Sequence, residues 1–189
     1  APELSKISSP VTDFECKKFK KLVIDLIDTC NVELGAGLAA NQIGILKRVL
    51  VLKPEVFGVT DFNGSDYNEK FLIMVNPVLE PSKEKKKWKE GCLSFREYSG
   101  LVERAERVKV SFVNEKGEKQ VLEAQWPFSA GVQHECDHLD GITFEKRMGS
   151  LSRSRLTGKI LKNKKAEARK KKKLEKERKN AADSSGSFR

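Results

Sequence analysis

The segment QHECDHLDG at residues 133–141 contains both histidines of the chain, and no other segment limits the possible folds so strongly. His134 and His138 are four positions apart, so on an α-helix their rings stand on one face and can bind one metal ion. With Glu135, they form the H-E-x-x-H pattern of zinc-hydrolase helices, in which the glutamate moves protons. A catalytic site of this type uses three protein ligands, so another segment must supply the third.

The four cysteines of the chain do not fit a disulfide framework. Cys16 and Cys30 fall in one expected helix, where a rise of about 1.5 Å per residue separates them by about 21 Å, too far for a bond. Cys136 lies in the H-E-x-x-H helix, turned away from the metal-binding face. Neither a disulfide nor a place in an expected helix accounts for Cys92, in KEGCLSF.

With 189 residues, 38% hydrophobic and 34% charged, the chain is long enough for one domain with a substantial core. No run approaches the roughly 18–20 apolar residues of a membrane-spanning helix, and no signal segment opens the chain. We expect a monomer without a membrane partner. It should act in a bacterial-type cytoplasm, or in an organelle matrix if a transit peptide has been removed.

Two helices are expected in the globular part. TDFE at 12–15 has the form of a capping box, with Thr12 or Asp13 near the N-cap and Glu15 reaching back, and apolar residues then recur at helical spacing over about 13–30. The H-E-x-x-H helix should span about 127–139, with Gly141 at its C′ position.

Strand patterns complete an α+β outline. RVLVLK at 48–53 and FLIMVNP at 71–77 predict strands on either side of a polar loop at 58–69. VKVSFV and KQVLEAQ flank NEKGE and predict a hairpin at about 108–125. We expect antiparallel strands wrapped around the metal-binding helix, with an N-terminal helix and a C-terminal basic helix.

GAGLAANQ at 35–42 and EGCLS at 90–94 are each weak signals alone. With QHECDHL, in this order and at these separations, they resemble the three signature motifs of the peptide deformylases, metal hydrolases that remove the N-terminal formyl group from nascent polypeptides. The family pattern is G-x-G-x-A-A-x-Q, E-G-C-L-S and Q-H-E-x-D-H, and every fixed letter is present. The resemblance extends from about Leu4 into the basic helix after residue 148.

The resemblance implies that Cys92, His134 and His138 bind one divalent ion and leave a position for water. Iron(II) is the ion we expect, although the ligands also suit zinc, nickel and cobalt. In the implied mechanism Glu135 takes a proton from the attacking water and later delivers it to the leaving amine. The oxyanion would be stabilised by two donors, the side chain of Gln42 and the backbone N–H of Leu93.

The residues expected to support the ligands are Asp137, as the partner that orients a histidine, and Arg104, as the partner of Glu90. The expected substrates are N-formyl-methionyl nascent peptides, extended against the backbone of Ala36, Gly37 and Gly91 like an added strand. By family position, the candidates for the methionine pocket are Trp88, Phe128 and Ala130.

Three departures from the family pattern lie near these residues. Ala36 stands where the family has Ile or Val, Phe95-Arg96 follow EGCLS in place of Ile/Val-Pro, and Ser99 replaces a usual arginine. None of them is a metal ligand, so we expect them to alter substrate preference and not the reaction.

Two alternatives remain open. H-E-x-x-H alone would also suit a metallopeptidase, against which Gln42 and the cysteine ligand argue. The chain could instead be a nucleic-acid-binding protein on an inactive scaffold, against which the intact Glu135 and ligand set argue.

Positive charge is concentrated near the C-terminus. Residues 1–145 contain 20 Lys and Arg against 23 Asp and Glu, whereas 146–180 contain 16 against 3. We expect a catalytic domain over 1–147, a basic helix over 148–180 and a flexible tail over 181–189. Such a helix is either a solvated basic face or, as in similar bacterial deformylases, a contact with ribosomal RNA.

Overall fold

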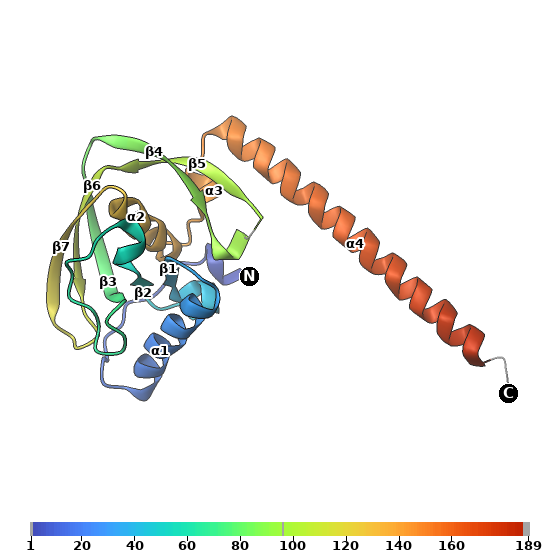
Figure 1. Ribbon diagram of the computed structural model, residues 1–189, viewed down its shortest axis with the longest axis horizontal. Coiled ribbons are helices and arrows are strands. Elements are labelled where there is room, and N and C mark those ends of the chain that lie inside the picture. The colour runs from blue at the N-terminus through green and yellow to red at the C-terminus, as the bar shows by residue number, and fades with distance from the viewer. Residues whose placement is uncertain (1, 96, 187–189) are drawn as a thin grey trace. The chain divides into compact units, whose positions relative to one another are not determined.

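A computed structural model describes residues 2–95 and 97–186 of the chain, and it divides into two units, Ala1–Met148 and Gly149–Arg189 (Figure 1). In the first unit, five antiparallel strands form a sheet in the order β1-β2-β3-β6-β7, and β4 pairs with β5 in a separate hairpin. The α2 helix contacts strands of both sheets. The prediction of an α+β fold with antiparallel strands around the H-E-x-x-H helix is confirmed.

The strands are β1 (Gly37–Ala39), β2 (Val49–Leu52), β3 (Leu72–Pro81), β4 (Lys85–Gly91), β5 (Ser99–Ala105), β6 (Arg107–Val113) and β7 (Lys119–Gln125). The α-helices are α1 (Lys17–Val32), α2 (Phe128–Leu139), α3 (Phe144–Arg147) and α4 (Ser150–Gly186). Short 3₁₀ helices are η1 (Pro2–Ser5), η2 (Ala40–Ile43), η3 (Pro54–Phe57) and η4 (Leu93–Phe95).

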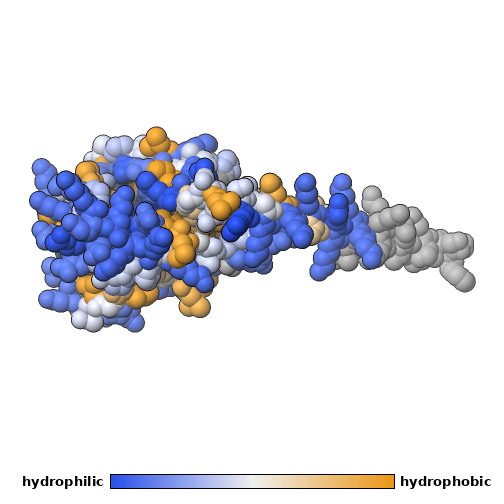
Figure 2. Space-filling model, turned by 90° about the horizontal axis from the view of Figure 1, so that it is seen from above, coloured by the Kyte–Doolittle hydropathy of each residue, from blue (hydrophilic) through white to orange (hydrophobic). Residues whose placement is uncertain are grey.

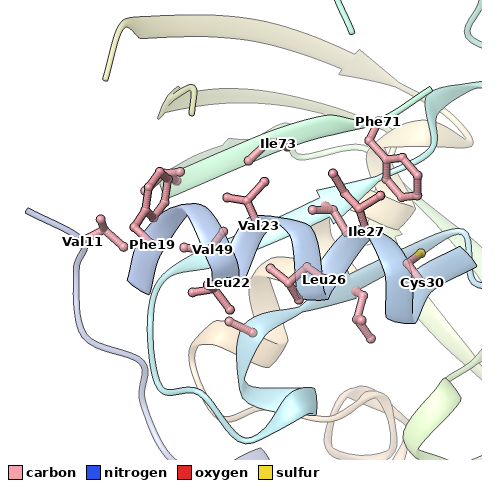
Figure 3. Packing of buried hydrophobic residues seen from close by; sticks show 14 residues of the cluster. Val11, Phe19, Leu22, Val23, Leu26, Ile27, Cys30, Val49, Phe71 and Ile73 are labelled. Atoms are coloured by element: carbon pink, nitrogen blue, oxygen red, sulfur yellow. The ribbon is translucent and has the colours of Figure 1, made fainter. Parts of the chain in front are cut away.

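The five-stranded sheet is buried on both faces around β2, because helices cover it from both sides. On one face, the apolar stripe of α1 packs against Val49, Ile73 and Phe71 (Figure 3). On the other face, Leu50 and Met74 pack with residues of α2. All four residues of β2 are therefore buried, which explains why this strand is a continuous apolar run without alternation.

The α2 helix ends as the sequence predicts. Gly141 has φ +68° and its N–H donates to the carbonyl of His138 at 3.0 Å, while the N–H of Ile142 donates to the carbonyl of Asp137 at 2.8 Å. These two bonds are those of a Schellman motif with glycine at C′. The helix thus stops directly after its second histidine.

The predicted start of α1 is wrong. The helix begins at Lys17, its N-cap is Cys16, and no side chain caps it. The carboxylate of Asp13 instead accepts the N–H groups of Glu15 and Cys16, at 3.0 and 3.1 Å. Asp13 therefore forms a local turn that competes with helix, and the expected capping box is not formed.

The second unit consists largely of α4, and its described side chains are mostly exposed and hydrophilic (Figure 2). The helix reaches Gly186, so it includes the first part of the segment 181–189 that the sequence predicts as a flexible tail, and residues 187–189 lie outside the described residues. Within residues 2–95 and 97–186, no helix combines the length and apolar character needed to cross a bilayer.

The β3 strand bends at a bulge, where its register with β6 shifts between Val75 and Val78. Asn76 lies in this bulge with φ +52°, and its side chain bonds both backbone groups of Val11, accepting the N–H at 2.9 Å and donating to the carbonyl at 2.8 Å. This amide therefore attaches the N-terminal segment to the sheet.

We expect Asn76→Ala to lower the free energy of unfolding by about 2–4 kcal/mol, because it removes both bonds and because alanine tolerates positive φ less well than asparagine. Denaturant unfolding would measure the change. Asn76→Gly should recover the backbone part of the loss alone. An alanine variant as stable as the parent would contradict this account.

Candidate metal centre and active site

Two elements bring the three candidate ligands together. His134 and His138 are on α2, and Cys92 lies between the end of β4 and the start of η4. Their ligand atoms lie within 4.8 Å of one another, and Sγ of Cys92 is 3.3 Å from Nε2 of His138. Sulfur and nitrogen ligands of a tetrahedral zinc-type ion lie about 3.6 Å apart. One thiolate and two imidazoles at this spacing therefore fit a divalent transition metal.

The two histidines are held differently. Nδ1 of His134 is 2.7 Å from Oε2 of Glu90, so its Nε2 is the nitrogen that faces the ligand cluster. Burial alone would lower the pKa of His134, but hydrogen bonds with Cys92 and Glu90 raise it to about 10. Burial and the charge of His134 lower the pKa of His138 to about 3. Both rings must be neutral to hold an ion, so an ion bound here would displace the proton that the contacts with Cys92 and Glu90 favour on His134.

Glu90 belongs to a buried ion network that joins the β4–β5 hairpin to α2. Arg104 donates to both oxygens of Glu90, at 2.6 and 3.0 Å, and to Oδ2 of Asp137 at 2.6 Å. Arg147 donates to both oxygens of Asp137. Burial raises the pKa of Glu90, but the bonds from Arg104 and His134 outweigh it and hold the value at about 2.

In this network Glu90 is the carboxylate that contacts a histidine. Asp137, expected from the sequence to orient a histidine, bonds to Arg104 and Arg147, and reaches His134 only through Arg104 and Glu90. The pair of Arg104 with Glu90 lies where the sequence places it.

Glu135 projects from α2 beside β1. Its Oε2 is buried and has no hydrogen-bond partner within the described part of the chain. Burial raises the pKa of this carboxyl to about 7, against the attraction of His134. A β-carbon added to Gly37 would lie 2.9 Å from Oε1 of Glu135 and 2.7 Å from Leu52, so only glycine allows β1 to pass this closely.

Gln42 faces the cluster with its amide nitrogen. Its Oε1 accepts the backbone N–H of Ala39 at 2.8 Å, which leaves Nε2 directed at Sγ of Cys92, 3.5 Å away, and Oγ of Ser94, 3.3 Å away. Leu93 is the first residue of η4, so its backbone N–H is not needed for the bonds of that turn. The side-chain amide of Gln42 and the backbone N–H of Leu93 are therefore hydrogen-bond donors beside the candidate metal ligands.

A cleft of about 560 Å³ lies over these groups. Of the predicted peptide-binding residues, it is lined by Ala36, Gly37, Gly91, Trp88 and Ala130. Phe128 is not among its lining residues. That side chain is buried in the core between α2 and the sheet, and its ring packs on Phe57, which does line the cleft, with 5.6 Å between centroids.

Sequence reasoning missed three residues that support the site. Asn41 donates to the carbonyl of His138 at 2.5 Å, and Gln133 bonds both backbone groups of Ala105 at 3.0 Å. Both lie within the quoted motifs, which was a usable signal. Arg147 lies outside the motifs, and nothing in the local sequence marks it as a partner of Asp137.

Comparisons with known proteins agree with this geometry. The polypeptide deformylase family matches residues 1–154. The chain is 38% identical over 162 residues to a peptide deformylase of Neisseria gonorrhoeae, covering 86% of this chain and 90% of the relative.

Solved structures of peptide deformylases are similar over most of the chain. The enzyme from Ehrlichia chaffeensis matches with a TM-score of 0.73 and 32% identity, covering 88% of this chain and 93% of that one. Peptide deformylase 1B of Arabidopsis thaliana, solved with an inhibitor, matches with a TM-score of 0.76 and 26% identity, covering 89% of each chain. The chain therefore belongs to the polypeptide deformylase family, whose members are metal-dependent enzymes.

Proposed function

We propose that this chain hydrolyses the formyl group of N-formyl-methionyl peptides, releasing formate, with Cys92, His134 and His138 holding one divalent ion. The observation that carries the proposal is the approach of three ligand atoms to within 4.8 Å beside the unpartnered carboxylate of Glu135. An ion at these ligands would acidify water and polarise the formyl carbonyl.

Side chains and backbone groups of the chain would perform the proton transfers, stabilise the developing charge and orient the ligands. Glu135 takes the proton of the attacking water and returns it to the leaving amine, because its buried carboxylate has an oxygen with no hydrogen-bond partner among the described residues. The amide N–H of Gln42 and the backbone N–H of Leu93 stabilise the negative charge that develops on the formyl oxygen. Glu90 keeps His134 oriented, and Arg104 with Asp137 keeps Glu90 charged.

The cleft would bind the peptide mainly through its backbone. Because β1 is an edge strand of its sheet, an extended peptide can pair along Ala36 and Gly37, with Gly91 beside it. Such pairing recognises the main chain and not the sequence. Trp88 and Ala130 would contact the methionine side chain, with Phe128 supporting the wall from behind through Phe57.

Iron(II) is our proposal for the native ion, because the thiolate of Cys92 combined with two imidazoles suits it, as it also suits zinc, nickel and cobalt. We propose that the protein acts as a monomer where formylated nascent chains are made, in a bacterial-type cytoplasm or an organelle matrix.

Anaerobic purification tests the proposal directly. The metal content and the hydrolysis of formyl-Met-Ala-Ser are measured on one sample, with unformylated Met-Ala-Ser as the twin substrate. Formate release with an intact product peptide supports the proposal. Cleavage of the unformylated twin would indicate a metallopeptidase, and tight metal binding without any hydrolysis would indicate an inactive scaffold.

For the partner of α4, we propose ribosomal RNA. The described side chains of residues 165–173 are exposed, and the lysines among them could release counterions from phosphates. The catalytic groups all lie in the first unit, so contact through α4 would not require a change in the active site.

Glu135→Ala should retain the metal and lose turnover by roughly two to four orders of magnitude, because the general base acts beside the metal without binding it. Cys92→Ala should lose both metal and turnover, because it removes a ligand. Metal analysis and formate release distinguish these outcomes. An active Glu135→Ala protein would refute the proposed proton transfers.

With iron(II) bound, activity should decline in air as the iron or Cys92 oxidises, whereas nickel(II) or cobalt(II) protein should decline more slowly. Half-lives of activity under air and under nitrogen measure the difference. An aerobic preparation with stable full activity and only zinc would reject iron as the native ion.

Deleting residues 163–189 should abolish co-sedimentation with ribosomes at low salt and leave hydrolysis of a free formyl tripeptide nearly unchanged, because α4 supplies no catalytic group. Binding of the intact chain should fall steeply with added salt.

Two variants with equal charge change test the position of this contact. One replaces Lys165, Lys170, Lys171 and Lys172 by glutamine, and the other does so at Lys83, Lys85, Lys87 and Lys89 of the first unit. All eight side chains are exposed. Only the α4 variant should lose ribosome binding, and equal binding by intact and truncated chains would reject the proposal.

A further inference from the structure

The β7 strand is the last in the order of the five-stranded sheet, so one of its long edges has no neighbouring strand among the described residues (Figure 1). The hydrogen bonds of the β6–β7 hairpin determine which backbone groups lie on that edge. The N–H of Asn114 donates to the carbonyl of Glu118 at 2.9 Å, and bonded pairs then alternate along the ladder. The backbone groups of Lys119, Val121 and Glu123 therefore point away from β6.

This edge is free to bind another strand. The backbone groups that point away from β6 have no hydrogen-bond partner within residues 2–95 and 97–186, and the side chain of Val121 is 62% exposed. A long strand edge with an apolar residue at its centre favours pairing with another extended chain. The edge is also separate from the active site, because β1 is at the opposite end of the sheet.

A second hollow, of about 810 Å³, lies beside this edge. It is lined by residues 120–123 of β7 and by most of the segment 57–65. Phe57, Val59 and Leu122 line it and are only partly buried, although they pack on the apolar core between α2 and the sheet. The core is thus open at this end, and an apolar group in the hollow would remove these side chains from water.

The hollow has an excess of negative charge. Four acidic residues line it: Asp61, Glu115, Glu118 and Glu123. The lysine that lines it, Lys116, has its ammonium 3.0 Å from a carboxylate oxygen of Asp66, so this positive charge is already paired. The hollow therefore favours an occupant that carries positive charge.

We propose that the free edge of β7 and this hollow together bind an extended peptide segment in which an apolar residue stands between lysine or arginine residues. The segment would pair with the backbone of β7 as an added strand and place its apolar side chain in the hollow. Side chains on one face of a strand are two positions apart, so its cations should lie two residues before and two residues after the apolar residue. This binding does not depend on the hydrolysis of formyl peptides.

Binding of synthetic heptapeptides, measured by isothermal titration calorimetry, tests the proposal. The reference peptide is acetyl-Thr-Lys-Thr-Leu-Thr-Lys-Thr-amide. Replacing both lysines by glutamate should weaken binding by about tenfold or more, because it reverses the charge match. Replacing the leucine by serine should weaken binding by a similar factor, because nothing then fills the hollow.

Methylation of the peptide's amides distinguishes strand pairing from other modes of binding. Two further peptides carry N-methyl groups on alternate residues, one at the odd positions and the other at the even positions. An added strand directs only every second N–H toward its neighbour, so one of the two peptides should lose binding and the other should retain it.

Variants of the protein locate the contact. Val121→Pro should weaken binding of the reference peptide by about tenfold or more, because it removes an N–H that β6 does not use, and proline is tolerated on a strand edge. Val121→Thr keeps this N–H, is the matched control and should bind like the parent protein. Val59→Trp fills the hollow and should also weaken binding. Circular dichroism verifies that each variant is folded, and if Val121→Pro does not fold, the N-methylated peptides decide alone.

Equal binding of the lysine and glutamate peptides would overturn the inference, as would equal binding by folded Val121→Pro and Val121→Thr. The same holds if both N-methylated peptides bind, or if the reference peptide does not bind at millimolar concentration. A doubled mass in analytical ultracentrifugation that Val121→Pro abolishes would assign the edge to a second copy of the chain, and would also overturn the inference.

Discussion

The buried pairing of Arg104 with Glu90 and Asp137 is the interaction on which the geometry of the site depends. Each of these charges would cost several kcal/mol if buried alone, so the three are stable only together. Glu90 is on β4 and Asp137 is on α2, and their shared arginine therefore fixes the hairpin against the helix. Cys92 follows Glu90 by two residues, so the same pairing also brings the thiol to the histidines.

The sheet supplies the second constraint. Because α1 and α2 cover opposite faces, β2 and the middle of β3 are buried on both sides, and α2 is held within the fold instead of lying on its surface. Almost every residue of α2 is buried, including the polar Ser129, Gln133 and Glu135. The enclosure of this helix removes Glu135 from water, and this burial raises the pKa of its carboxyl to about 7.

The sequence predicted the elements that have a regular spacing of apolar residues or contain a recognisable motif. The α2 helix and its glycine end, the strands of the sheet core and the β6–β7 hairpin follow from apolar spacing and turn residues. The strands β1, β4 and β5 were not predicted, because β1 has three residues, β4 is mainly lysine, and β5 has only two large apolar residues, Leu101 and Val102. The start of α1 was mispredicted because Asp13 bonds locally. The contacts of Arg147 with Asp137 depend on tertiary packing, which leaves no local pattern.

The fixed amide of Gln42 has a consequence for inhibitor design. Because the N–H of Ala39 holds its oxygen, the amide cannot rotate to offer an acceptor to the cleft. A compound built for this centre should therefore direct an oxygen acceptor or anion toward Nε2 of Gln42, because an amine or ammonium group would be placed against the N–H groups of that amide. The orientation of one side-chain amide thus limits which chelating groups can be accommodated beside the metal ligands.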